Sequence, residues 1–445
     1  MRPRKGSRTR KSTRGRTWQK EIEDDDIGYA AKLGTKLSDL SNSSEEEVGA
    51  STADESTDRF ISFERDLRQK HSKACKAMSK AVYHVALEEF ESILADLLSR
   101  YGERHERVGA ALHNVAIANL RAGSLDDAMD AIEEAIKIRS RAVGRSHPKV
   151  ADSLVELGII LLSMEEHDDS LKVFQRALKL RKEEQNDVLS DDDLDESNLK
   201  IAKVLNNIGC VSFEKGELVE AKQSFEQAIV LQKGVFHSWF NMLCGADSNS
   251  PGILTMASTM CNKGYVEIEQ ENYLEAVKVF TESLQIQKSV LGSGNKLVQS
   301  SLDNLGYAYV MLNQNEKALK AYGEIWNAQR YSNDPKEEKV ETLRKVIASY
   351  GQLKDWANVF PALEALEDLL LDMDDDKKEM TKTRKLLGEV NYQLLKLPSL
   401  SGATTRAFGC GVCTGPTEEE VNLDDWLIRK PDNTSKMSGH RVTHA

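Results

Sequence analysis

Long apolar runs are missing from this 445-residue chain, and cysteine is scarce. No stretch approaches the roughly 18 consecutive apolar residues that a membrane-spanning helix requires. The N-terminus lacks the apolar segment of a secretory signal, and six cysteines are too few for a disulfide framework in a chain of this length. We therefore expect a protein of a reducing compartment, most simply the cytoplasm.

Proline is also scarce, with eight residues, whereas 40% of the residues are hydrophobic and 30% are charged. This composition favours helices over sheets. Charge is unevenly distributed, because residues 1–20 contain nine Lys or Arg and no acidic residue. The net charge of −12 therefore leaves −21 on residues 21–445. Such an acidic body is a poor surface for nucleic acid.

Sequence motifs of catalysis are absent as well. The chain contains no GxxxxGKS or GxxxxGKT, no GxGxxG, no GxSxG and no HExxH pattern. The acidic run 191–196 lacks the central Gly and the final Glu of an EF-hand calcium loop. We expect neither an enzyme nor a protein that uses a cofactor, a metal ion or a small-molecule substrate.

The sequence does contain an internal repeat. Each copy has a Gly or Ala, called the mark here, a small residue twelve positions later, a large residue four beyond that, and a usually small residue three further on. Four copies have Gly marks: Gly158/Ser170/Phe174/Ala177, Gly209/Ala221/Phe225/Ala228, Gly264/Ala276/Phe280/Ser283 and Gly306/Ala318/Tyr322/Ile325. A fifth copy has Ala116/Ala128/Ile132/Ala135, and a weaker sixth has Ala74/Ala86/Phe90/Ile93.

This spacing predicts pairs of antiparallel helices. In each pair, helix A contains the mark and helix B contains the three residues that follow it in the pattern. Helices packed about 8–10 Å apart need small residues where they cross, and larger residues at helical spacing fill the remaining space. Marks 74, 116 and 158, and again 264 and 306, are 42 residues apart. The usual tetratricopeptide unit has 34 residues, and eight more add about one turn to each helix.

The 42-residue period, with openings such as HPKVADSLVELG, resembles the tetratricopeptide repeats of kinesin light chains over about residues 66–330. The resemblance implies an all-α fold, a tetratricopeptide-type right-handed superhelical solenoid of antiparallel helix pairs. It also implies a scaffold or adaptor that binds extended peptide segments of other proteins in a concave groove.

We divide the chain accordingly. Residues 1–58 form a disordered basic-then-acidic arm, and 398–445 a disordered tail, because neither can bury enough apolar surface. Six repeats are expected over 59–330, with inserts near 185–198 and 235–254, followed over 331–397 by a degenerate repeat, interrupted by Pro361, and a capping helix. The second insert either forms a contact surface or folds back over the array through Phe236, Trp239, Phe240, Met242 and Leu243.

Candidate groove residues lie two positions before and one position after the mark, on the face of helix A opposite its packing stripe. An asparagine there offers a donor and an acceptor that match a peptide unit, and kinesin light chain-like repeats carry Asn at this place. The alternative is a polar residue tolerated on an exposed face. The expected peptide-groove residues are Asn114, Asn207, Asn262, Asn304, Tyr265 and Tyr307, with Glu156 as the exception to the Asn rule.

A chaperone-type carboxylate clamp is not expected. Such a clamp needs Lys or Arg beside Asn at the preceding positions of helix A, and no such cluster is present there. Those positions hold His113, Val155, Asn206, Cys261 and Asp303.

Three terminal features have more than one interpretation each. Trp426, flanked by acids, resembles peptides bound by kinesin light chain grooves and suggests docking of the tail into its own groove, but an ordinary acidic tail with one aromatic residue is the favoured interpretation. Cys410 and Cys413, with His440 and His444, offer zinc ligands or a redox pair, but the 26-residue gap favours an incidental pair. The basic arm indicates a solvated tail, nuclear import or a transit peptide.

Three functions follow from these patterns. The first is a protein-interaction scaffold with a peptide-binding groove. The second is a kinesin light chain-like cargo adaptor, although residues 21–65 lack the heptads of a motor-joining coiled coil. The third is a nucleic-acid-associated factor that uses the basic arm.

Overall fold

The computed structural model describes residues 53–186, 190–236, 251–373 and 377–395, and the regular elements in these ranges are all α-helices. The chain divides after Glu184 into two compact units. Unit 1 contains α2 (Ala53–Ser79), α3 (Tyr83–Tyr101), α4 (Glu106–Ala122), α5 (Leu125–Val143), α6 (Pro148–Ser163) and α7 (His167–Gln185). Unit 2 contains α8 (Asp191–Glu214), α9 (Leu218–Val235), α11 (Pro251–Glu269), α12 (Tyr273–Leu291), α13 (Lys296–Met311), α14 (Asn315–Gln329), α15 (Lys336–Gln352), α16 (Trp356–Leu371) and α17 (Lys377–Leu395).

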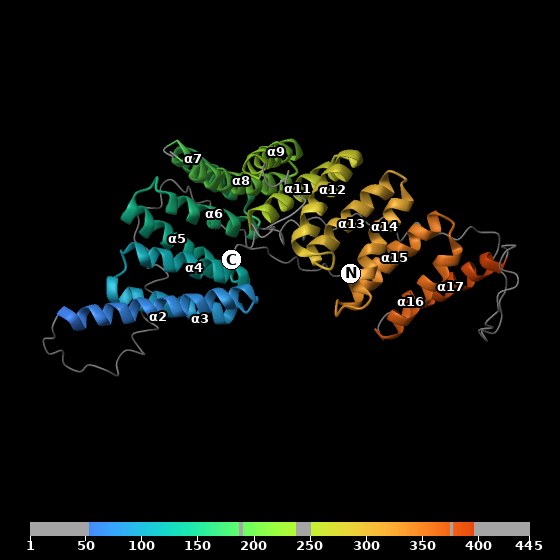
Figure 1. Ribbon diagram of the computed structural model, residues 1–445, viewed down its shortest axis with the longest axis horizontal. Coiled ribbons are helices and arrows are strands. Elements are labelled where there is room, and N and C mark those ends of the chain that lie inside the picture. Colours follow the sequence, from blue (N-terminus) through green and yellow to red (C-terminus); the bar gives the residue numbers. More distant parts are fainter. Residues whose placement is uncertain (1–52, 187–189, 237–250, 374–376, 396–445) are drawn as a thin grey trace, which may run out of the picture. The chain divides into compact units, whose positions relative to one another are not determined.

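Within each unit the helices alternate between A and B and stack as antiparallel pairs (Figure 1). The all-α repeat fold expected from the 42-residue period is therefore confirmed. The boundary expected near residue 58 is displaced, because α2 begins at Ala53.

The Gly marks place an aromatic ring directly against the backbone of helix A. A Cβ on Gly158, Gly209 or Gly264 would lie 2.6 Å from a ring carbon of Phe174, Phe225 or Phe280, and on Gly306 it would lie 2.5 Å from Tyr322. No side chain tolerates such contacts, so the aromatic ring requires Gly opposite it. Where the mark is Ala116, the facing residue is the smaller Ile132, and both are fully buried.

The turns between helices A and B also repeat. The seventh residue after each mark adopts a left-handed conformation, with φ between 56° and 85°. Gly123 and Gly216 do this without strain, whereas Ala81, Glu165, Glu271 and Asn313 are residues for which positive φ is uncommon. The tight helix–helix turn therefore dictates the backbone even where the residue type disfavours it.

Much of the predicted acidic insert near 185–198 is helical within the described residues. Residues 191–198 form the first two turns of α8, which is longer than the other A helices of unit 2. The Ser190 hydroxyl accepts a hydrogen bond from the Asp193 amide, and the following acids lie at the positive end of the helix dipole.

Beyond residue 330 the period continues in α15. Ala348, 42 residues after Gly306, is fully buried at the position of the mark. Its partner helix α16 buries Val359, Leu363 and Leu366, each one residue earlier than in the other repeats. The shift arises because the turn between the two helices is one residue shorter, which hides the repeat from a fixed-spacing search.

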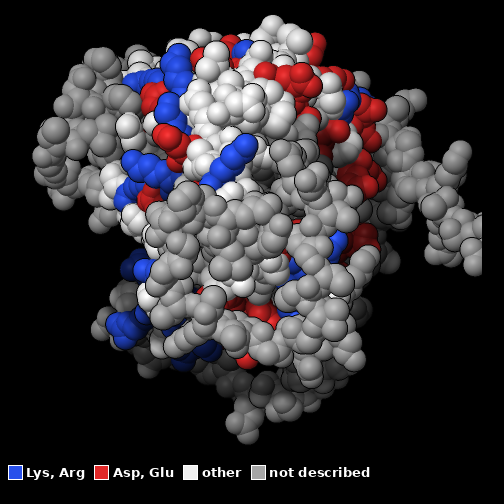
Figure 2. Space-filling model, turned by 90° about the vertical axis from the view of Figure 1, so that its right-hand side faces the viewer, with Lys and Arg blue, Asp and Glu red and all other residues white. Residues whose placement is uncertain are grey.

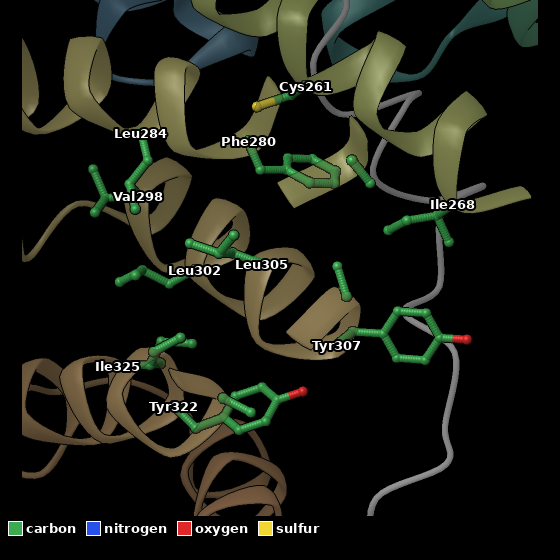
Figure 3. Close-up of a cluster of buried hydrophobic side chains, with 14 of the residues drawn as sticks. Cys261, Ile268, Phe280, Leu284, Val298, Leu302, Leu305, Tyr307, Tyr322 and Ile325 are labelled. Carbon is green, nitrogen blue, oxygen red and sulfur yellow. The ribbon is translucent and has the colours of Figure 1, made fainter. Parts of the chain in front are cut away.

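The core of unit 2 runs between successive helix pairs. One cluster joins α11, α12, α13 and α14 through residues such as Phe280, Leu302 and Ile325 (Figure 3). Another joins α9, α11 and α12 and includes Phe236, the first aromatic residue of the insert near 235–254, in one cluster with Ile253 and Met256. Residues 237–250 of that insert lie outside the described residues, as do most of the arm and all of the tail.

Candidate peptide-binding face

Three asparagines occupy equivalent places on consecutive A helices of unit 2. Asn207 on α8, Asn262 on α11 and Asn304 on α13 each lie two residues before a Gly mark, and we call them the Asn column. Their side chains are 3%, 1% and 0% exposed. The sequence placed them on an open face, but the structure buries them between neighbouring helices.

Hydrogen bonds hold the column in place. Asn262 Nδ2 donates to Asn206 Oδ1 at 2.9 Å, which ties α11 to α8. Asn304 Nδ2 donates to the Tyr265 hydroxyl at 2.9 Å and to the Ser300 carbonyl at 2.8 Å, which ties α13 to α11. The contact of Asn207 Oδ1 with Asn206 Nδ2 is long, at 3.5 Å.

Each member of the column retains one amide atom without a partner. These buried atoms are Nδ2 of Asn207, Oδ1 of Asn262 and Oδ1 of Asn304. A buried polar atom left unpaired costs about 1–3 kcal/mol. The column therefore offers one donor and two acceptors whose hydrogen-bonding capacity the described part of the chain does not use.

The two predicted tyrosines differ in role. Tyr265 is fully buried, its ring packs edge-to-face on Phe280 at 5.7 Å, and burial raises the pKa of its hydroxyl well above the usual range. Tyr307 is nearly buried as a ring, but its hydroxyl points away from the other labelled core residues (Figure 3). Of the two, only Tyr307 presents a polar atom away from the core.

Unit 1 presents different chemistry at the same positions. Asn114 on α4 is half-buried, and α6 carries Glu156 instead of Asn. The residues after the marks are Ile117 and Ile159 rather than tyrosines. Of the six predicted groove residues, the structure thus groups five in unit 2 and leaves Asn114 in unit 1.

Sequence reasoning missed a second set of buried polar residues, which we call the polar seam. Each lies on a B helix, 23 residues after the mark, and at most 7% of it is exposed. The constant offset from the mark was the available signal. The members are Arg139, Arg181, Gln232, Gln287 and Gln329.

Contacts of the seam differ between the units. In unit 1, Arg139 donates to the Lys149 carbonyl at 2.9 Å and to the Ser153 hydroxyl at 2.7 Å, whereas Arg181 pairs with Asp152 and with Glu184. Burial lowers the pKa of Arg139. In unit 2 the glutamines each use Nε2, for example Gln329 to Gln299 at 2.8 Å, while the Oε1 atoms remain unpartnered.

Charge is also segregated on the surface. Figure 2, which presents the α17 end of unit 2, shows Lys and Arg mainly towards one side and Asp and Glu mainly towards the other. Inside the unit, Glu267 is fully buried beside Lys222 at 2.9 Å and Lys263 at 3.8 Å. This pair of lysines neutralises an acid that would otherwise be costly to bury.

Other predicted features fall outside the described residues, namely Cys410, Cys413, His440, His444 and Trp426. Within the described ranges, no group of three or more His, Cys, Asp or Glu residues is placed to hold a metal ion. In the same ranges, no helix combines the length and apolar character needed to cross a membrane.

Comparison with known proteins identifies the repeats. Tetratricopeptide repeat models match residues 107–183, 202–233 and 255–326. No curated protein sequence matches the chain.

Solved structures of helical repeats are similar in fold at low identity. The nearly identical TPR-like repeats assigned to a kinesin light chain of Podosopora anserina are 16% identical, with a TM-score of 0.39, and the match covers 52% of this chain and 99% of that one. A tetratricopeptide repeat protein from Parabacteroides merdae is 13% identical, with a TM-score of 0.38 and coverage of 73% and 99%. A STAND protein with a tetratricopeptide repeat sensor from Pyrococcus horikoshii is 13% identical, with a TM-score of 0.49 and coverage of 70% and 42%.

Tetratricopeptide repeats are scaffolds for protein–protein interaction and are typically not enzymes. The family models match the helix pairs α4–α5, α6–α7, α8–α9, α11–α12 and α13–α14. The chain therefore contains tetratricopeptide repeats, which the family models match over residues 107–183, 202–233 and 255–326.

Proposed function

We propose that this scaffold is an adaptor that binds extended peptide segments of partner proteins along the Asn column of unit 2, without catalysing a reaction on them. Its partners are other proteins, and Asn114 supplies the equivalent position in unit 1. The proposal rests on one observation above all, the unpartnered amide atom on each of Asn207, Asn262 and Asn304.

These atoms are closed to solvent in the unbound structure, so an extended backbone complements them once neighbouring side chains move aside to expose them. Its carbonyl can accept from Asn207 Nδ2, and its amides can donate to the Oδ1 atoms of Asn262 and Asn304. Adjacent helices lie about 8–10 Å apart, and an extended chain rises about 3.3 Å per residue, so one asparagine meets roughly every third peptide residue. Each new hydrogen bond would remove part of the cost of an unpaired buried atom.

The test begins with peptide selection. The full chain is used to select binders from a phage library of random 12-residue peptides, and synthetic copies of the best binders are titrated by fluorescence anisotropy. The informative variant is Asn207→Ala, because Asn207 makes only the long contact with Asn206 and its loss disturbs the fold least.

We expect Asn207→Ala to weaken peptide binding roughly fivefold or more, which corresponds to about 1 kcal/mol. The thermal midpoint should hardly change. The control is Asn358→Ala on α16, an exposed asparagine that bonds to Asp355 away from the column. If both variants bind peptide as the parent does, the Asn column is not the binding site.

A further inference from the structure

Two arginines of the polar seam in unit 1 occupy equivalent places in successive repeats. Arg139 on α5 and Arg181 on α7 each lie 23 residues after a mark, and their exposed fractions are 7% and 3%. Arg181 pairs with Asp152 on α6 and with Glu184 one turn further along α7. Two carboxylates thus balance this guanidinium, as a buried cation ordinarily requires.

The acids Asp152 and Glu184 have alanines at the equivalent positions of the α4–α5 pair. Six residues before the mark, that pair has Ala110 where the α6–α7 pair has Asp152. Three residues after the seam arginine, it has Ala142 in place of Glu184. A methyl group carries no charge and accepts no hydrogen bond, so neither alanine balances Arg139.

Arg139 has no other counter-ion within the described residues. Its Nη1 atom donates to the Lys149 carbonyl and to the Ser153 hydroxyl, which are neutral acceptors, and its buried Nε atom has no partner. Glu106, at the start of α4, is engaged by the ammonium group of Lys149. Burial lowers the pKa of Arg139, because it removes the charged form from water.

The place of the missing acids can be reached from the surface. Half of the Asp152 side chain stays exposed while it contacts Arg181, so an acid at this position is open to solvent. At the equivalent positions Ala142 is exposed and Ala110 is half-buried. A carboxylate that arrives there from solvent can accept from the unpartnered Nε of Arg139 and from its second amino nitrogen, the bidentate pairing that a guanidinium favours.

We propose that Arg139 binds the carboxylate of an Asp or Glu side chain of a partner protein, at the place left by Ala110 and Ala142. A carboxylate is the ligand class because the α6–α7 pair places two carboxylates beside the same arginine. The site belongs to unit 1 and does not involve the Asn column. It also differs from a chaperone-type clamp, whose cations lie on the A helices.

Nuclear magnetic resonance of the full chain, labelled with ¹⁵N in its arginines, tests the site with acetate as the probe. Sodium acetate replaces sodium chloride at constant ionic strength, so that only the anion changes. The Nε–H signal of Arg139, identified by its loss in Arg139→Gln, should shift with acetate until it saturates. The Nε–H signal of Arg181 should shift about fivefold less, because its own acids already pair with it.

The matched variant is Ala142→Glu, which supplies the acid that the α6–α7 pair has. It should reduce the acetate-induced shift of the Arg139 signal about fivefold or more, because the new carboxylate pairs with the guanidinium first. Ala142→Gln adds a side chain of similar size without the charge and should leave the shift within about twofold of the parent. Position 142 is exposed, so both variants should keep the circular dichroism spectrum of the parent.

The source of the carboxylate is tested with peptides selected by the full chain from the random 12-residue library. Synthetic copies end in an amide, so that only side-chain carboxylates are available. Changing the Asp or Glu of the tightest acidic peptide to Asn or Gln should weaken its binding to the parent about fivefold or more, and its binding to Ala142→Glu less than about twofold.

Two results would overturn the site itself: an Arg139 signal that does not respond to acetate, or one that responds equally in the parent and in Ala142→Glu. If acetate binds but no selected peptide depends on an acidic side chain, the site takes small anions only, and its assignment to a partner protein is wrong. Neither result bears on the Asn column, which Asn207→Ala tests separately.

Discussion

Units 1 and 2 have the same repeat geometry but different chemistry at equivalent positions. In the polar seam unit 1 has arginines where unit 2 has glutamines. Beside the marks unit 1 has isoleucines where unit 2 has a cysteine and two tyrosines. The matched sets are Arg139 and Arg181 against Gln232, Gln287 and Gln329, and Ile117 and Ile159 against Cys210, Tyr265 and Tyr307.

The difference shows that packing and polar chemistry are encoded at separate positions of one repeat. Marks, crossing residues and left-handed turns recur in both units, since every helix pair needs them. The polar positions vary, because Arg181 in unit 1 faces the acids Asp152 and Glu184, whereas the seam glutamines of unit 2 each leave Oε1 unpartnered. Unit 2 therefore concentrates the chemistry that suits a peptide backbone.

The largest expected effect comes from the shared packing rule. Gly209→Ala should destabilise the protein by about 1–3 kcal/mol, because the added methyl would overlap the Phe225 ring. Adding Phe225→Ile, which copies the Ala116–Ile132 pair of unit 1, should recover more than half of that loss. Urea unfolding followed by circular dichroism measures the free energy of unfolding of the parent, the two single variants and the double variant. If the losses of the two single variants simply add in the double variant, the packing rule is wrong.

The next effect separates the two asparagine environments. Asn304→Ala should cost about 1–3 kcal/mol, because it leaves the buried Tyr265 hydroxyl without its donor. Asn114→Ala, at the half-buried position of unit 1, should change stability by no more than about 0.5 kcal/mol. If thermal unfolding shows that Asn304→Ala and Asn114→Ala lose similar amounts of stability, the two positions are equivalent.

A smaller contrast is expected in the polar seam. Arg181→Gln should cost about 1–2 kcal/mol, since it removes the cation that Asp152 and Glu184 face, although Asp152 is half exposed and stays solvated. Gln287→Met should be neutral or stabilising by up to about 1 kcal/mol, because Oε1 of Gln287 has no partner. Chemical denaturation of both variants measures whether a substitution in the polar seam reduces the free energy of unfolding more in unit 1 than in unit 2.

The smallest effect concerns alkaline pH and unit 2. Burial raises the pKa of Tyr265, Tyr307 and Tyr322, so the folded state holds these protons more tightly than the unfolded state does. Their contribution to stability is complete below about pH 10, the unfolded value, and falls as pH rises beyond it. The urea midpoint should decline between pH 9 and 11, and Tyr322→Phe should reduce that slope.

Tyrosinate absorbance at 295 nm, recorded in the same titrations, provides the control. Tyr265 and Tyr322 should ionise only as unit 2 unfolds. If every tyrosine ionises while the helical signal is intact, burial does not set their titration.

Much of the fold follows from the sequence because the repeat spacing reports helix crossings directly. Gly158 to Phe174 and Gly306 to Tyr322 are contacts that the sixteen-residue offset predicts and the structure contains. The start of α8 escaped prediction because residues 191–196 show no apolar periodicity. Their helix depends instead on the Ser190 cap and the helix dipole.

The candidate site was predictable only in part. Helical periodicity assigns Asn207, Asn262 and Asn304 to one face of their helices. How far these side chains are buried depends on how closely the neighbouring A helices approach, which periodicity does not record. The polar seam was missed for a related reason, since a pattern search counts Gln and Arg as solvated. Gln287 is buried because α12 packs against both α11 and α13, which no local window records.

The central claim is that partner peptides bind along the A helices of unit 2. Hydrogen–deuterium exchange of the full chain, with and without a saturating selected peptide, measures this directly. We predict slower exchange in α8, α11 and α13 around the Asn column, with little change in α9, α12 and α14. Protection confined to the B helices, or to unit 1, would contradict the account.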